Sequence, residues 1–96
     1  MKTIATLRQE IDQVHKELHA LMLRRRDLTM AVWEIKQKEG QPFFNAEREE
    51  QIIRDFVNMD GQQGKDPAMD ELLKGVMNSV LREYEKYLRS KFTEKT

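Results

Sequence analysis

Residues 4–35 carry apolar side chains at alternating steps of three and four residues, the spacing of the a and d positions of a heptad repeat. No glycine or proline interrupts the chain before Gly40 and Pro42. The pattern therefore predicts one helix from about Thr3 to about Lys38, which would be about 54 Å long. The apolar positions are Ile4, Leu7, Ile11, Val14, Leu18, Leu21, Leu28, Val32 and Ile35.

Two shorter helices are expected after the long one. Asn45 is typical of an N-cap and is followed by acidic residues, so a second helix should run to about Val57. A polar loop that contains two glycines comes next. Asp66 then suits an N-cap and Pro67 a first turn, which predicts a third helix that fades over residues 89–91. Without any alternating strand pattern, the fold class expected is all-α, with three helices in a single domain over residues 1–96.

Composition excludes several classes of protein. Lys+Arg and Asp+Glu both number 17 and the pI is about 6.7, which argues against a nucleic-acid or anionic-membrane binder. The absence of cysteine excludes disulfides, thiolate zinc sites and thiol nucleophiles. The N-terminal segment lacks the apolar run expected of a signal peptide, and no run approaches the roughly 20 apolar residues of a membrane span. We therefore expect a cytoplasmic protein.

The long heptad seam needs a partner. The two shorter helices cannot cover a rod of this length, and an exposed apolar seam promotes association. The pattern therefore predicts a homodimer, or a higher oligomer, that pairs through the first helix.

Arg25 occupies an a position, where a charge is costly unless it is paired. It could be solvated, it could pair with an acid, or it could line a polar cavity that holds an anion. Lys36 lies 11 residues further on, which places both cations on one helix face about 16 Å apart. Two long side chains could converge on a small molecule between them.

Arg8 lies too far from Arg25 along the rod for one metabolite to touch both within a single chain. An antiparallel partner would remove this obstacle. Reflection about the centre of the helix, near residue 20, places the partner's Arg8 opposite residue 32, between Arg25 and Lys36. An intertwined antiparallel dimer would then hold two equivalent sites, each with cations from both chains.

Other polar and aromatic residues allow more than one interpretation. Arg48 and Glu49 lie one turn before Ile52 and Ile53 on the expected apolar side of the helix, so they could turn inward or remain solvated. His15 and His19 have an i, i+4 spacing that could hold zinc, but without a third histidine a solvated pair is favoured, and no metal site is predicted. Three aromatic residues are expected to cover the junction of the first two helices rather than bind a ring: Trp33, Phe43 and Phe44.

Four segments together resemble the all-helical, type II class of chorismate mutases. They are "LRQEID" at residues 7–12, "LRRRDLTMAVWEIK" at 23–36, a G-x-P at 40–42 and "NAEREEQII" at 45–53. The resemblance is continuous from about Leu7 to Ile53. It implies an intertwined dimer of three-helix chains that converts chorismate, a small dicarboxylate, to prephenate without metal or cofactor.

The resemblance also implies roles for individual residues. Arg25 would bind one carboxylate of the substrate, and the partner's Arg8 would help bind the other. Lys36 would lie between the ether oxygen and a carboxylate. Glu49 would accept a hydrogen bond from the ring hydroxyl, with Arg48 beside it. Asn45 stands where the family often has aspartate, and as a cap residue it could act through its backbone.

The third helix departs from the family pattern, which commonly presents a serine and, four residues later, a glutamine or glutamate. Alignment of the apolar stripes places Tyr84 and Leu88 at these positions, and this register is preferred because it keeps the apolar stripe of the helix buried. A shift of three residues would place Leu81 and Glu85 there instead. In that case Glu85 could donate a hydrogen bond only when protonated.

Chorismate mutase is therefore the function expected from the sequence. A related pericyclic enzyme, such as a 4-amino-4-deoxychorismate mutase or an isochorismate-pyruvate lyase, would share the arginines and the lysine. A non-catalytic coiled-coil module is the alternative from another class, favoured by the heptads and by the apolar residue at position 88.

Overall fold

The computed structural model describes residues 1–61 and 63–92, and within these the chain forms three α-helices and no strand. The all-α class and the long first helix are thereby confirmed. The helices are α1 (Ile4–Glu39), α2 (Ala46–Val57) and α3 (Pro67–Lys91).

Side-chain caps set the starts of the three helices, and two of them, Asn45 and Asp66, are the caps predicted from the sequence. Thr3 is the N-cap of α1 rather than its first residue, and it forms a capping box with Thr6. The side chain of Asn45 accepts a hydrogen bond from a backbone N–H of the first turn of α2, and Asp66 does the same for α3. At the other end of α1, Gly40 has φ 69°, a left-handed conformation that glycine adopts without a steric penalty.

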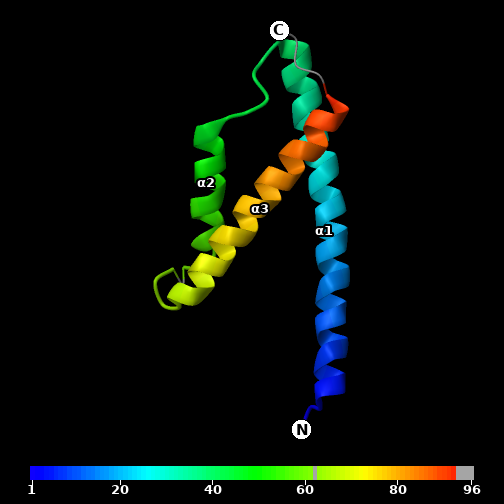
Figure 1. Cartoon of the computed structure of the whole chain (residues 1–96), viewed down its shortest axis with the longest axis vertical. Coiled ribbons are helices and arrows are strands. Elements are labelled where there is room, and N and C mark those ends of the chain that lie inside the picture. Colours follow the sequence, from blue (N-terminus) through cyan, green and yellow to red (C-terminus); the bar gives the residue numbers. More distant parts are fainter. Residues whose placement is uncertain (62, 93–96) are drawn as a thin grey trace.

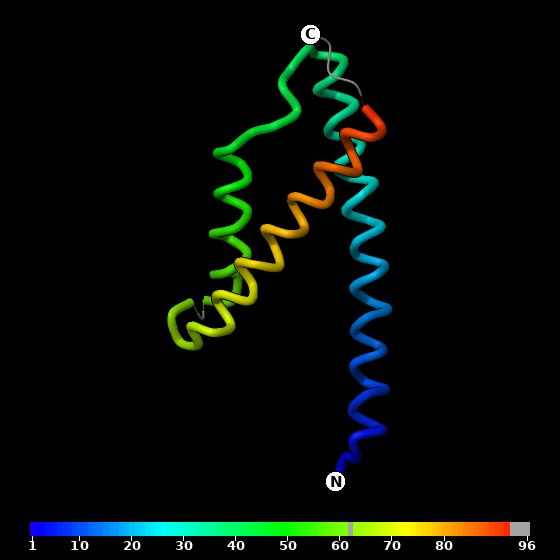
Figure 2. The backbone as a smooth tube through the Cα atoms, viewed as in Figure 1, coloured from blue at the N-terminus to red at the C-terminus, as the bar shows by residue number. Residues whose placement is uncertain are grey.

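The helices have an uneven arrangement. The described chain measures 59 × 29 × 17 Å, and α1 runs along the longest dimension. In Figures 1 and 2, α3 crosses α1 near the C-terminal end of α1, and α2 lies beside the first half of α3. The N-terminal half of α1 projects away from both, and every residue from 1 to 21 is exposed.

A small aromatic core holds the crossing of α1 and α3 together. The rings of Trp33 and Phe43 stack with centroids 4.2 Å apart and planes 3° from parallel. Phe92 contacts both rings at 5.9 Å in a tilted arrangement, and Leu88 is buried in the same cluster. The sequence predicted that Trp33 and Phe43 cover the junction of the first two helices; in the structure they pack against α3 residues, at the crossing of α1 and α3.

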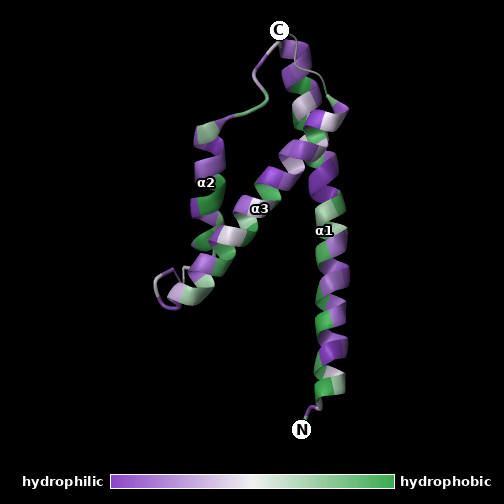
Figure 3. Cartoon of the chain, in the orientation of Figure 1, coloured by the Kyte–Doolittle hydropathy of each residue, from purple (hydrophilic) through white to green (hydrophobic). Residues whose placement is uncertain are grey.

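The heptad stripe of α1 is exposed along its whole length. All nine of its apolar a and d side chains are between 44% and 69% exposed. Figure 3 shows hydrophobic residues recurring along α1, including the half that projects from the rest of the chain. None of the helices in the described part of the chain combines the length and the apolar character needed to cross a membrane.

Candidate functional site

A cavity of about 350 Å³ lies beside the C-terminal half of α1, against the start of α2 and the second half of α3. Five charged residues line it, together with apolar side chains such as Leu28, Val32 and Ile52. This volume is in the range of pockets that hold small molecules. The charged residues are Arg25, Lys36, Arg48, Glu49 and Glu85.

Arg25 lines this cavity, so a place at a cavity, one of the three environments left open by the sequence, is the one observed. Its guanidinium lies over the ring of Tyr84, 4.5 Å from the ring centroid. Partial burial lowers the pKa of Arg25, and the nearby Arg48 acts in the same direction, whereas Tyr84 and Glu49 oppose the shift. An arginine remains charged at neutral pH even so, so the cavity has a fixed, partly desolvated cation.

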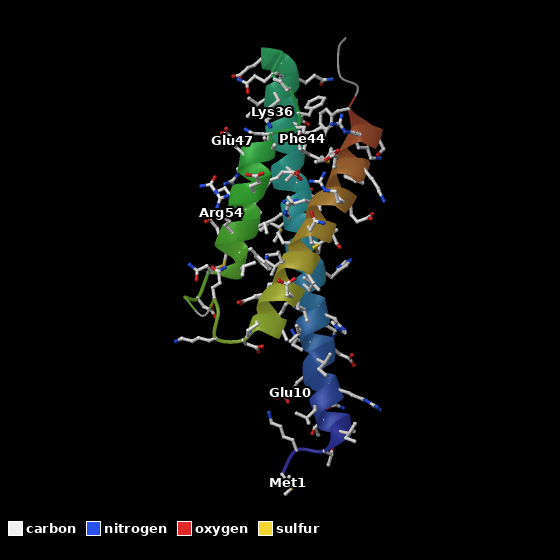
Figure 4. All side chains as sticks on the ribbon, turned by 60° about the vertical axis from the view of Figure 1, so that its left-hand side comes forward. Met1, Glu10, Lys36, Phe44, Glu47 and Arg54 are labelled. Atoms are coloured by element: carbon white, nitrogen blue, oxygen red, sulfur yellow. The ribbon has the colours of Figure 1, made fainter. Side chains whose placement is uncertain are left out.

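Lys36 reaches the cavity from the same face of α1. Its Nζ donates a hydrogen bond to the carbonyl oxygen of Phe43 at 2.9 Å, which fixes the ammonium group against the segment that connects α1 to α2. Figure 4 shows Lys36 near Phe44, which also lines the cavity. A lysine ammonium has three N–H donors, so two remain for a bound molecule.

The first turn of α2 supplies the next group of lining residues. Asn45 Oδ1 accepts a hydrogen bond from the backbone N–H of Arg48 at 3.0 Å, which orders this turn. The Arg48 guanidinium donates to Gln51 at 3.3 Å. Glu49, which is 21% exposed, forms an ion pair with Arg82 of α3. The sequence left open whether Arg48 and Glu49 turn inward, and the structure places both at the cavity.

The third wall comes from α3 and combines the two registers considered from the sequence. Leu81, Glu85 and Leu88 line the cavity, whereas Tyr84 does not. The hydroxyl of Tyr84 instead donates to the backbone carbonyl of Met22 on α1. Tyr84 therefore reaches the site only through the face of its ring, beneath the Arg25 guanidinium.

Arg8 lies outside the cavity, on the exposed N-terminal half of α1. No contact within the described chain connects it to the other site residues, which agrees with the distance calculated from the sequence. His15 and His19 are exposed on the same half, and the described residues include no group of three or more potential ligands that could hold a metal ion.

Arg82 is a residue that the sequence did not single out. Its guanidinium pairs with Glu49 of α2 and, at 3.0 Å, with Glu85 of α3. The spacing of Arg82 and Glu85 indicates a helix-surface ion pair. The link to Glu49 spans 33 positions and leaves no local signal in the sequence.

Three cations that project into a partly open cavity with apolar walls can hold a small anion in a defined orientation. Two carboxylates, one on α2 and one on α3, can accept hydrogen bonds from a hydroxyl or amino group. The chain has no cysteine that could act as a nucleophile. A site that acts by holding charges in place needs none.

Comparison with known proteins agrees with this chemistry. A family model described as chorismate mutase type II matches residues 7–86, which extends well beyond the four segments that carry the resemblance. Comparison with curated proteins and with solved structures gave no match.

Proposed function

The chain belongs to the chorismate mutase type II family, and from this premise we propose that it converts chorismate to prephenate. The observation that carries the proposal is the cavity that unites Arg25, Lys36, Arg48 and Glu49 from two helices. A non-catalytic coiled-coil module would have no reason to hold these groups around one space. The reaction is unimolecular: one C–O bond breaks while one C–C bond forms.

The physics of this rearrangement suits the residues at the cavity. The enzyme must hold a flexible dianion in a compact conformation and stabilise the negative charge that develops on the ether oxygen. We assign one substrate carboxylate to Arg25, and the ether oxygen and a carboxylate to Lys36. Glu49 accepts from the ring hydroxyl. Arg48 and Asn45 contribute to the same wall.

We propose that a second copy of the chain completes the site. The cavity is partly open in the single chain, and the exposed stripe of α1 passes along it through Leu28 and Val32. In an antiparallel pairing about residue 20, the partner's Arg8 comes opposite Val32, at the open side. Such a homodimer would bury both apolar stripes and supply the cation for the second carboxylate.

The direct test is to incubate the purified protein with chorismate and follow the loss of its ultraviolet absorbance and the appearance of prephenate. Arg25→Ala is the matched variant, expected to lose at least about 10³-fold in kcat/KM, because a fixed cation that binds the dianion is removed. Its helicity, measured by circular dichroism, should stay near that of the wild type. Full activity of Arg25→Ala would refute the assignment of the site.

A related pericyclic activity is the second candidate, and the α3 wall favours it. In the register preferred from the sequence, Leu88 replaces the polar side chain that the resemblance implies, and both Leu88 and Glu85 line the cavity. The 4-amino-4-deoxy analogue of chorismate, and isochorismate with release of pyruvate, should be assayed in parallel. The substrate with the highest kcat/KM identifies the activity.

The third candidate is a domain without catalytic activity. A bicyclic dicarboxylate that mimics the transition state should raise the melting temperature of a protein with a formed site, because a ligand that binds only the folded state stabilises it. An unchanged melting temperature, together with no turnover of any of the three substrates, would favour a coiled-coil module.

A further inference from the structure

Arg82 connects two carboxylates that line the cavity without lining it itself. One Nη atom pairs with Glu49 on α2, and the other donates to Glu85 on α3 at 3.0 Å. The guanidinium also lies 6.0 Å from the ring centroid of Phe44, which is part of the cavity lining. One side chain therefore contacts three residues of the cavity wall.

We propose that Arg82 is a positioning residue that holds the Glu49 and Glu85 carboxylates at the cavity wall and offsets their negative charge. The inference deepens the proposed function and rests on it for its kinetic test. It assigns a task to a residue that neither the sequence pattern nor the resemblance identified.

The charge balance of the cavity shows why an offset is needed. The lining includes two carboxylates, Glu49 and Glu85, in a space proposed to receive a molecule with two carboxylates of its own. Both are largely withdrawn from solvent, with exposed fractions of 21% and 26%, so water screens their repulsion of a bound anion only in part. Arg82 adds one positive charge directly against both.

The contacts around Arg82 allow its effect on the charge of the cavity to be separated from its effect on the position of the Glu49 carboxylate. Glu85 also contacts Arg89, at 3.4 Å, so it keeps one cationic neighbour when Arg82 is removed. The ion pair of Glu49 with Arg82 ties α2 to α3. The planar guanidinium has donors on three nitrogens, two of which are used here, whereas a lysine has donors on one. The position of the two carboxylates should therefore depend on the forked geometry of arginine. The compensation of their negative charge should require only a cation at position 82.

The ion pairs of Arg82 should contribute little to the stability of the fold. Arg82 is 42% exposed, and ion pairs at that exposure contribute little to stability. A residue with such a small structural contribution should be replaceable without loss of the fold. The kinetic effects of its replacement then report on the site.

The kinetic test uses chorismate and four variants. Arg82→Met should raise KM on the order of tenfold, through uncompensated repulsion, and should also lower kcat, because Glu49 loses its support. Adding Glu85→Gln to Arg82→Met should bring KM back toward the wild-type value but leave kcat low. Arg82→Lys should keep KM near that of the wild type and lower kcat.

Lys86→Met is the matched control, since it removes a cation from an exposed i, i+3 pair with Glu83 on the same helix. Its kcat and KM should equal those of the wild type. The inference is overturned if Arg82→Met keeps both constants within twofold of the wild type. It is equally overturned if Glu85→Gln does not lower KM in the Arg82→Met background, as a merely structural role would predict.

A positional measurement keeps the inference separate from the proposed function. Crystal structures of the wild type and Arg82→Met should show the Glu49 carboxylate displaced from the cavity wall in the variant. If the wild type turns over no chorismate, the proposed function fails, and this comparison alone decides the inference. A Glu49 carboxylate in the same place in both structures would overturn it.

Discussion

The two halves of α1 share one heptad pattern, but only one of them packs against the rest of the chain. The half beyond residue 21 packs against α3 and contributes Trp33 to the aromatic core. The half before it has every residue exposed, including five apolar residues of the repeat. One half is folded by contacts within the chain. The other is a stable structure only if something else covers it.

The two halves show that one continuous heptad pattern can run from a packed part of the chain into a part that is fully exposed. The apolar stripe is not covered by α3 even in the packed half, where Val32 and Ile35 remain 49% and 55% exposed. The same stripe therefore offers one continuous face along α1, with Arg25 as the single charged position in it. We propose that this surface binds the second copy, so that the two halves of α1 come together across the dimer.

The largest effect should come from a charge in the unpacked half. Leu18→Glu would place two carboxylates near the centre of the antiparallel seam, each at a cost of several kcal/mol. We expect the dimer to dissociate, with at least about a 10³-fold loss of association constant and with loss of activity. Analytical ultracentrifugation measures the change in mass.

The control for this variant is Lys16→Glu, two residues earlier and on the outer face of the heptad, which should leave the mass unchanged. A Leu18→Glu protein that remains a fully active dimer would contradict the proposed pairing.

Trp33→Ala tests the packed half. Loss of a buried ring that stacks on Phe43 should lower the free energy of unfolding by about 3 kcal/mol. Because the contact lies within one chain, the difference from the wild type should not change with protein concentration, in contrast to changes in the seam. Urea unfolding at two concentrations measures this. A difference that varies strongly with concentration would contradict the distinction between the two halves.

Arg8→Ala tests whether the exposed half of α1 in one chain contributes to the site beside the packed half in the other. Alone, it should lower kcat/KM about 10²-fold, through loss of the second cation for the substrate. Equal amounts of Arg8→Ala and Arg25→Ala chains, unfolded and refolded together, should regain about a quarter of wild-type activity, because half of the dimers would contain one intact site.

The two variants refolded separately are the control, and they should stay at their low activities. If the mixture shows no more activity than the average of the two, each site is built from a single chain, and the shared site is refuted.

The smallest effect is expected at the start of α2. Asn45→Ala removes the side-chain acceptor for the backbone N–H of Arg48 and should lower stability by about 1 kcal/mol. It should also lower kcat/KM modestly, by disordering the turn that presents Glu49. Asn45→Asp keeps the acceptor and should behave like the wild type in thermal unfolding. Equal losses in the two variants would show that the cap is not the reason for this residue.

Much of the fold could be predicted because its causes are local. The heptad, the caps at Asn45 and Asp66 and the glycine after α1 define helix ends through contacts within a few residues. The face shared by Arg25 and Lys36 follows from the helical repeat alone, and the structure places both at one cavity. The roles of these residues, the dimer and the contribution of Arg8 remain predictions.

The rotation of α3 could not be predicted in the same way. Periodicity shows which α3 residues share a face, but not how that face is turned toward α1 and α2. Packing decides this: Tyr84 turns to the Met22 carbonyl, and Leu81 and Glu85 come to the cavity beside Leu88. The wall is therefore a mixture of the two registers.

The amino-acid sequence by itself determined the helices, their polarity and the long seam, because hydrogen bonds and side-chain spacing within a helix depend on neighbours in the chain. Only the tertiary structure decided which charges meet. Arg82 reaches Glu49 because α2 and α3 lie side by side, and that depends on contacts between residues far apart in the sequence.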